Sequence, residues 1–185
     1  MTTAERLARY EDLLSLPDNV VGEIIAGQLV THPRPAPTNA RASSVLGNKV
    51  GTPFDLGEGG VGGWWIFDEP ELHLSKDILV PYLASWRRER MPALPKTAWF
   101  EMAPDWVCEV LSPATTRTDR VLKLPRYAAD GVAHCWLIDP GARTLEAYTN
   151  QGGRWLLLGT WGGDDVATID PFAAIRLSLA GLWVN

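Results

Sequence analysis

The sequence predicts a mixed α/β protein built around a central β-sheet that is covered on both sides. The first observation is the segment 105–111, which is apolar at nearly every position, as in a strand buried on both faces. The second is a similar apolar run at 134–138. The third is the segment 118–131 between them, which has the residue pattern of a helix. A strand, a short loop and a returning helix therefore form the predicted centre of the protein.

The N-terminal part of the chain is predicted to form a helix, a hairpin and a second helix. Apolar residues at helical spacing open the chain, and Pro17 ends that helix. Short apolar runs on either side of Ala26-Gly27 are typical of strands joined by a tight turn. We expect, in order, a helix over 3–14, strands over 20–25 and 28–31, and a helix over 38–50.

The middle of the chain is predicted to contain a loop and two long strands. The segment 55–63 is rich in glycine but lacks Gly-Lys-Ser/Thr, so we interpret it as a surface loop and not as a phosphate-binding loop. One long, bent strand is expected over 64–74 and another over 78–86. Because Pro81 cannot donate to a β-ladder, it marks the end of regular pairing or an edge.

The C-terminal part is predicted to contain a divided helix, a buried strand and a hairpin. Thr118 or Asp119 caps a helix that ends at Gly131, and Pro125 should kink it or divide it into two pieces. A strand over 134–140 follows, then a hairpin formed by 144–149 and 154–161. A chain of 185 residues is most simply one domain, and we expect the whole of 1–185 to be a single unit.

The composition narrows the class of protein. No segment has the apolar core of a signal peptide or the length of a membrane span. Cys108 and Cys135 both lie in apolar runs, which favours reduced thiols in a cytoplasmic protein. A net charge of -5 argues against a general nucleic-acid coat protein but leaves room for a local basic patch. The dense candidate for nucleic-acid contact is Arg87, Arg88 and Arg90, for which a solvated surface turn is the simpler interpretation.

Glu109 is the residue whose position most needs an explanation. Side chains alternate along a strand, so Glu109 shares a face with Val107 and Leu111. An ionised carboxylate there is costly unless a cation, a metal or strong donors compensate it. The helix that follows can bring Lys123 over the end of this strand. A buried ion pair is one interpretation, and a site in which carboxylates hold a divalent cation is the other.

Glu23 is a second carboxylate within an apolar run, where it alternates with Val21 and Ile25. Taken alone, this pattern favours an edge-strand residue that points to water. No other catalytic or metal-binding pattern stands out. The chain has no Gly-x-Ser-x-Gly elbow, and its histidines and cysteines are too dispersed for a structural zinc site.

Several of these segments together resemble the Uma2 family, also called DUF820, a restriction-endonuclease-like group within the PD-(D/E)XK nuclease superfamily. The resemblance extends from about Tyr10 to Tyr148. It is carried by five segments in the same order: Glu23 to Gly27, Val80 to Leu83, Val107 to Pro113, Asp119-Arg120 with Lys123 and Tyr127, and Gly131-Val132 followed by Trp136 to Pro140.

The resemblance implies a three-layer restriction-endonuclease-like fold, with a central mixed sheet flanked by helices and an added C-terminal hairpin. It also implies a Mg²⁺-dependent DNA endonuclease that acts as a homodimer, while no partner methyltransferase can be inferred. Carried over to this chain, Glu109 and Glu23 would be metal ligands. Lys123 would replace the lysine of the usual Glu-x-Lys motif, whose position is occupied by Leu111.

One departure from the family pattern concerns a metal ligand. Where the family has Pro-Asp, this chain has Pro81-Tyr82, and a phenol is a poor ligand for Mg²⁺. Asp77 lies five positions earlier, on the opposite face of a regular strand, and nothing in the spacing selects Glu71 as a substitute. The family's histidine on the second helix is also replaced, by Thr38-Asn39.

Two functions therefore compete at this point. The first is a Mg²⁺-dependent endonuclease that retains Glu23, Glu109 and Lys123. The second is a catalytically inactive nuclease fold that binds DNA or a protein partner, which the replacement at Tyr82 favours. A third, simpler interpretation is an ion pair that only stabilises the fold.

Overall fold

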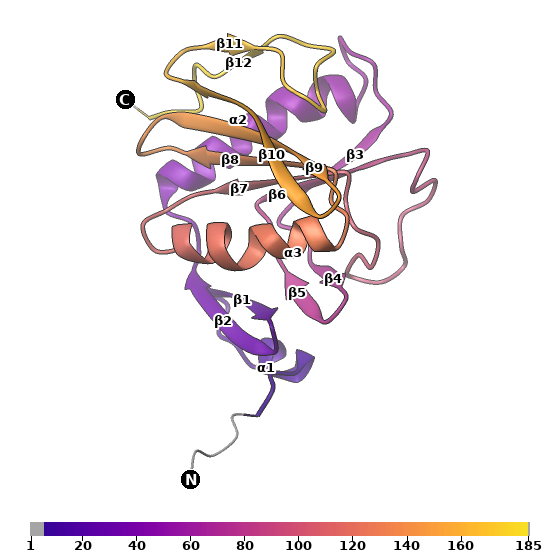
Figure 1. Cartoon of the computed structure of the whole chain (residues 1–185), viewed down its shortest axis with the longest axis vertical. Coiled ribbons are helices and arrows are strands. Elements are labelled where there is room, and N and C mark those ends of the chain that lie inside the picture. The colour runs from indigo at the N-terminus through magenta and orange to yellow at the C-terminus, as the bar shows by residue number, and fades with distance from the viewer. Residues whose placement is uncertain (1–5, 185) are drawn as a thin grey trace.

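The computed structural model describes residues 6–184 and contains a large sheet with helices on both faces (Figure 1). The large sheet has six strands in the order β10-β9-β8-β7-β6-β3. Its strands are β3 (Trp64–Asp68), β6 (Leu83–Arg87), β7 (Trp106–Val110), β8 (His134–Asp139), β9 (Thr144–Gln151) and β10 (Arg154–Gly162). β7 and β8 are parallel and the other neighbours are antiparallel, so the sheet is mixed and the expected fold class is confirmed.

The two faces of β7 belong to two separate parts of the core. Trp106, Cys108 and Val110 pack on the side covered by helix α2 (Pro37–Phe54) and the C-terminal segment. Val107 and Leu111 pack on the side covered by the helical segment 118–129, with Tyr127 and Val132. The alternation that the sequence predicts for this strand is therefore present. The two cysteines, both free, fall into different clusters, Cys108 in the first and Cys135 in the second.

The helical segment 118–129 crosses the face of the sheet opposite α2, as Figure 1 shows. It consists of a π-helix, η1 (Thr118–Lys123), followed directly by α3 (Leu124–Ala129). Pro125 lies in the first turn of α3, where its missing N–H is tolerated. The backbone is helical through the junction at Lys123 and Leu124, so the segment changes its hydrogen-bonding pattern there and is not broken at Pro125.

A smaller four-stranded sheet, in the order β2-β1-β5-β4, lies at one end of the molecule. Its strands are β1 (Val20–Ile25), β2 (Gln28–Pro33), β4 (Leu72–Leu74) and β5 (Asp77–Leu79). The hairpin of β1 and β2 is as predicted, with its turn at Ala26-Gly27. A third pair, β11 (Val166–Ala167) and β12 (Leu177–Ser178), lies in the C-terminal segment.

The prediction of two long strands in the middle of the chain is wrong. The segment 64–74 is divided between β3 of the large sheet and β4 of the small one, with Glu69 at a positive φ of 44° between them. The segment 78–86 is divided in the same way between β5 and β6. The second division falls at Val80-Pro81-Tyr82, where Pro81 ends regular pairing as expected.

The first helix is shorter than predicted. α1 covers only Tyr10–Leu14, and residues 3–5 of the expected helix lie outside the described part of the chain. The Asp12 carboxylate accepts the N–H of Arg9 at 2.7 Å, which caps the helix at that point. The Ala8 N–H donates to the Gly27 carbonyl at 2.8 Å, which holds the residue just before the helix at the β1–β2 turn. Within residues 6–184, no helix is both long and apolar enough to cross a membrane.

Asn39 joins α2 to the end of β7 and offers a test of this architecture. Its buried amide nitrogen donates to the Val110 and Leu111 carbonyls, at 3.2 and 2.9 Å. Asn39→Ala leaves both carbonyls without this donor, so the free energy of unfolding should fall by about 1–3 kcal/mol. Urea denaturation measures the change, with Asn48→Ala on the exposed side of α2 as the control. Equal stability of the two variants would contradict the role of Asn39.

Candidate active site

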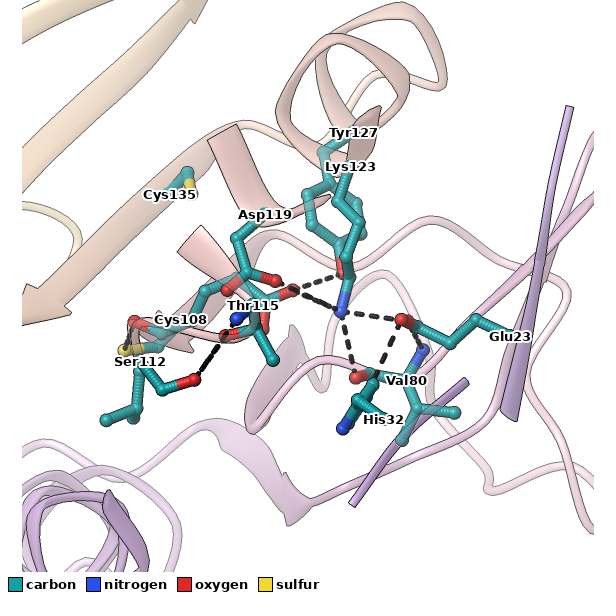
Figure 2. A network of polar contacts seen from close by, with 12 residues as sticks. Glu23, His32, Val80, Cys108, Ser112, Thr115, Asp119, Lys123, Tyr127 and Cys135 are labelled. Atoms are coloured by element: carbon teal, nitrogen blue, oxygen red, sulfur yellow. Dashed lines mark hydrogen bonds and ion pairs between the residues drawn. The ribbon is translucent and has the colours of Figure 1, made fainter. Parts of the chain in front are cut away.

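The ammonium group of Lys123 lies between two buried glutamates. Lys123 Nζ is 2.8 Å from Glu23 Oε1 and 2.8 Å from Glu109 Oε1. All three side chains are almost completely buried. The structure thus brings together residues from β1, β7 and η1, and Figure 2 shows the Glu23 carboxylate and the Lys123 nitrogen pointing toward each other.

The backbone of Val80 completes the contacts of Lys123. The Val80 carbonyl accepts a hydrogen bond from Lys123 Nζ at 3.1 Å, and the Val80 N–H donates to Glu23 Oε1 at 2.7 Å. These two backbone groups are available because regular pairing ends at Pro81. The interruption between β5 and β6 therefore supplies a donor and an acceptor to the site.

Glu23 is buried, and its strand β1 is paired on both sides, with β2 and with β5. The expectation that Glu23 lies on an edge strand and points to water is therefore wrong.

Each carboxylate of the site has one engaged oxygen and one without a hydrogen-bond partner. Glu109 Oε1 accepts from Lys123 and from the Tyr127 hydroxyl, the latter at 2.7 Å. Glu23 Oε1 accepts from Lys123 and Val80. Glu109 Oε2 and Glu23 Oε2 are buried and accept no hydrogen bond. Unpartnered oxygens on buried carboxylates are costly, and these two atoms are free to accept a cation or a hydrogen-bond donor.

Asp119 and His32 also belong to this site, and the sequence reasoning missed both. Asp119 Oδ1 is 4.0 Å from Lys123 Nζ, and Asp119 Oδ2 is a third buried oxygen without a partner. His32 Nε2 is 3.8 Å from Glu23 Oε2. An acid four residues before a lysine in a helical segment is a signal that could have identified Asp119. The register of the hairpin, with His32 opposite Val21, places His32 on the same face as Glu23.

The electrostatics of the site reflect three acids around one ammonium. Burial opposes the charge of Lys123, but Glu109, Glu23 and Asp119 outweigh it and raise the pKa of the ammonium. Burial raises the pKa of Glu109 to about 8, although Lys123 opposes the shift. Burial also raises the pKa of Asp119, again against the effect of Lys123. One lysine is thus not enough to compensate the three carboxylates when all are ionised.

Tyr82 separates this site from an open groove. Tyr82, Glu109, Asp119 and Lys123 line a cavity of about 10 Å³, close to the space that one water needs. Tyr82 also lines a groove of about 300 Å³ along α2, and only 8% of its surface is exposed. Burial, followed by the charges of Glu109 and Asp119, raises the pKa of the Tyr82 phenol. The phenol is therefore neutral and forms a wall between groove and site.

Asp77 and Glu71, the two acids that the sequence offered as substitutes at the position of Tyr82, lie outside this site. Asp77 accepts the Ala26 N–H at 2.7 Å and pairs with Arg126 at 2.6 Å. Glu71 contacts His73 Nε2 at 2.6 Å. Neither lines the small cavity.

The three arginines predicted to contact nucleic acid lie at the end of β6 and in the turn that follows, and two of them are held by acids. Arg88 pairs with Asp55 at 2.7 Å, and Arg90 pairs with Asp105 at 2.8 Å. Arg87 lies over the Trp64 ring, with 4.7 Å between its guanidinium carbon and the ring centroid. Their contact with nucleic acid stays a prediction.

The donor atoms of the site suit a hard divalent cation, although they do not form a coordination shell as they stand. Carboxylate and carbonyl oxygens are the ligands that Mg²⁺ prefers, and three carboxylates here have a buried oxygen to offer. In residues 6–184, no three His, Cys, Asp or Glu side chains are grouped closely enough to hold an ion. Lys123 Nζ stands between the glutamates and is itself the cation that they share.

The chain matches a known protein family in sequence and a solved structure in fold. Residues 7–180 match the Uma2 family, which is described as "Putative restriction endonuclease". Among solved structures, the chain is similar to the crystal structure of a "putative nuclease belonging to DUF820" from Anabaena variabilis ATCC 29413. The two share 22% sequence identity over 93% of this chain and 95% of that chain, with a TM-score of 0.74, which establishes the common fold. No curated protein matches the chain.

The raised pKa of Glu109 predicts a pH-dependent stability. The unfolded chain releases this proton near pH 4.5 and the folded chain near pH 8, so the folded state holds more protons between them. The contribution of Glu109 to the free energy of unfolding should therefore fall as the pH rises through this window. Urea denaturation should show a weaker dependence in Glu109→Gln than in the parent between about pH 5 and pH 8.

A control for this experiment is Glu58→Gln, which changes an exposed glutamate in the glycine-rich loop. This variant should keep the pH dependence of the parent. An unchanged pH dependence in Glu109→Gln would contradict the prediction.

Proposed function

Because the chain belongs to the Uma2 family, we propose that it is a Mg²⁺-dependent endonuclease that hydrolyses phosphodiester bonds in DNA. The observation that supports this most directly is Lys123 Nζ at 2.8 Å from both Glu23 and Glu109. A lysine beside two acids is the set of side chains expected in a metal-dependent nuclease site. We also propose a homodimer, since two active sites suit a cut of both DNA strands. Light scattering should then give twice the mass of one chain.

Glu23 and Glu109 are the proposed magnesium ligands. In each, the protein holds one oxygen in place, through Val80 and Lys123 or through Tyr127 and Lys123. The second oxygen of each remains available. When bound at such a site, Mg²⁺ lowers the pKa of a water molecule and offsets the charge that develops on the phosphate.

Lys123 has the role of a positioned cation. Its ammonium keeps its proton because three acids surround it, so it can donate hydrogen bonds to a phosphate oxygen or orient a water. Tyr127 is a positioning residue, since its hydroxyl fixes the orientation of the Glu109 carboxylate. For a phosphate to reach these groups, the wall formed by Tyr82 has to move aside.

A second candidate function is an inactive nuclease fold that binds DNA or a protein partner. Tyr82 favours it, because a neutral phenol occupies the place of an acidic ligand. The small volume of the cavity, about 10 Å³, favours it as well.

Digestion of plasmid and single-stranded DNA in Mg²⁺ or Mn²⁺ distinguishes the two functions. The parent should cut, and Glu109→Gln and Lys123→Ala should each reduce the rate by about 100-fold or more, as expected for loss of a charged group in an active site. Lys49→Ala, on α2, is the control that should cut like the parent.

Folding has to be checked for each variant. Lys123→Ala leaves buried acids unpaired and is expected to reduce stability by about 3–5 kcal/mol. Glu109→Gln avoids this loss, because it removes an acid that is already in excess, and it keeps the test valid if Lys123→Ala unfolds.

The variant Tyr82→Asp distinguishes a catalytically active site from one that has lost its activity. A parent that does not cut, together with cutting by Tyr82→Asp, supports the inactive fold as the function of this chain. If neither protein cuts DNA, the proposed endonuclease is wrong.

A further inference from the structure

The strand β10 leaves a long row of backbone groups unpaired at one end of the large sheet. It is the longest of the described strands, with nine residues, and it has β9 on one side only. Within residues 6–184, the backbone of 154–161 pairs with β9 alone. Such an edge presents its free N–H and carbonyl groups to any other strand that approaches it.

The other edges of the two larger sheets are protected. On β3, the Ile66 N–H donates to the Asp55 carboxylate at 3.1 Å. On β4, the His73 N–H donates to the Phe100 carbonyl at 2.8 Å. The edge strand β2 has six residues and ends at Pro33. Proline and short length both discourage the pairing of an edge with another chain, so β10 is the exception in this fold.

Three consecutive leucines make the β10 edge apolar as well. Leu156, Leu157 and Leu158 are 47%, 51% and 41% exposed. Successive side chains of a strand point to opposite faces, so apolar surface is exposed on both sides of this edge. Between Arg154 and Gly162 the strand contains no charged residue, although charges are a common means of keeping an edge strand unpaired.

A β-bulge divides β10 into two regular stretches. The register against β9 shifts between Leu157 and Gly159, with 154–157 on one side and 159–162 on the other. A bulge by itself discourages pairing, because it twists the strand. A twofold axis near Leu158 avoids this obstacle. The bulges of two copies then face each other, and each regular stretch of one copy meets the other stretch of the second copy.

The charges at the two ends of β10 are complementary in this arrangement. Arg154 begins the strand, Asp164 and Asp165 follow its end, and all three are exposed. Arg143 contacts Asp164 at 3.1 Å, so two acids share one base and this end keeps an excess negative charge. Antiparallel pairing brings the start of one strand to the end of the other. The free arginine of each copy then lies near the aspartates of the other copy.

We propose that β10 pairs antiparallel with β10 of a second copy of this chain, so that the two large sheets become one continuous sheet. The same surface is used on both copies, as in most twofold dimers. β8 and β9 separate this interface from β7, which carries Glu109. The interface rests on the proposed homodimer, whose contact it specifies, and it does not depend on DNA cleavage.

Sedimentation of the full chain over a range of concentrations tests this interface. The parent should be a dimer. Leu157→Lys should raise the dissociation constant by about 100-fold or more, because a twofold interface contains the substitution twice and each copy loses a buried leucine. The matched control is Leu94→Lys, which should dissociate like the parent. Leu94 is exposed to a similar extent, 45%, but lies in the loop after β6. Melting curves verify the folding of both variants.

An exchange of charges tests the antiparallel arrangement. Arg154→Asp should weaken the dimer by about threefold to tenfold, as expected for two exposed ion pairs. Adding Asp164→Arg should restore the affinity toward that of the parent, because the two ends are again opposite in charge. A double variant that dissociates more readily than Arg154→Asp would contradict the antiparallel arrangement.

Amide hydrogen exchange locates the contact on the chain. The amides of 154–161 that face away from β9 should exchange slowly in the parent dimer and rapidly in Leu157→Lys, because pairing with a second strand protects them. Rapid exchange of these amides in a parent dimer overturns the interface.

The outcomes separate this interface from the proposed function. A monomeric parent overturns the interface together with the homodimer, leaves the edge to a strand of another protein, and does not affect the digestion test. A dimer that persists unchanged in Leu157→Lys keeps the homodimer but overturns this interface. A dimer that depends on Leu157 in a protein that cuts no DNA supports the interface and overturns only the endonuclease.

Discussion

The ammonium of Lys123 is the interaction on which the arrangement of this protein depends. It joins a carboxylate of the small sheet, a carboxylate of the large sheet and a backbone carbonyl from the segment between them. Removing one partner of such a buried group leaves the others uncompensated, so the parts cannot separate without a large cost. The hairpin of β1 and β2, the break at Pro81 and the helix η1 are therefore held together through one nitrogen atom.

Two irregular segments place the groups that surround this nitrogen. Pro81 ends the pairing of β5, which turns the Val80 N–H and carbonyl toward Glu23 and Lys123. The π-helix η1 brings Asp119 and Lys123 to the same cavity. The two glutamates thus extend from the regular strands β1 and β7, while the irregular segments supply the backbone groups, the aspartate and the lysine that surround them.

The sequence predicts the local structure of this fold better than the assignment of strands to sheets. The burial of β7 on both faces could be predicted because side chains alternate along a strand. The segments 64–74 and 78–86 could not be divided correctly, since both halves of each are apolar and the choice of sheet is made by distant partners. The pairing of Glu109 with Lys123 could be expected from the order of strand, loop and returning helix, whereas Glu23 was added to the site only through the family resemblance. Asp119 was missed because its burial depends on packing that its neighbours in the sequence do not reveal.

The separation of Glu23 and Lys123 along the chain has a consequence for folding kinetics. Their contact closes a long loop, which includes most of the small sheet and half of the strands of the large one, and such contacts carry a large entropic cost before they form. The cluster is then expected to assemble after the central strands, as the hairpin docks onto a sheet that already exists. Interactions formed after the transition state act mainly on the rate of unfolding. The ion pairs that define the site are thus expected to slow unfolding and so to lengthen the lifetime of the folded state.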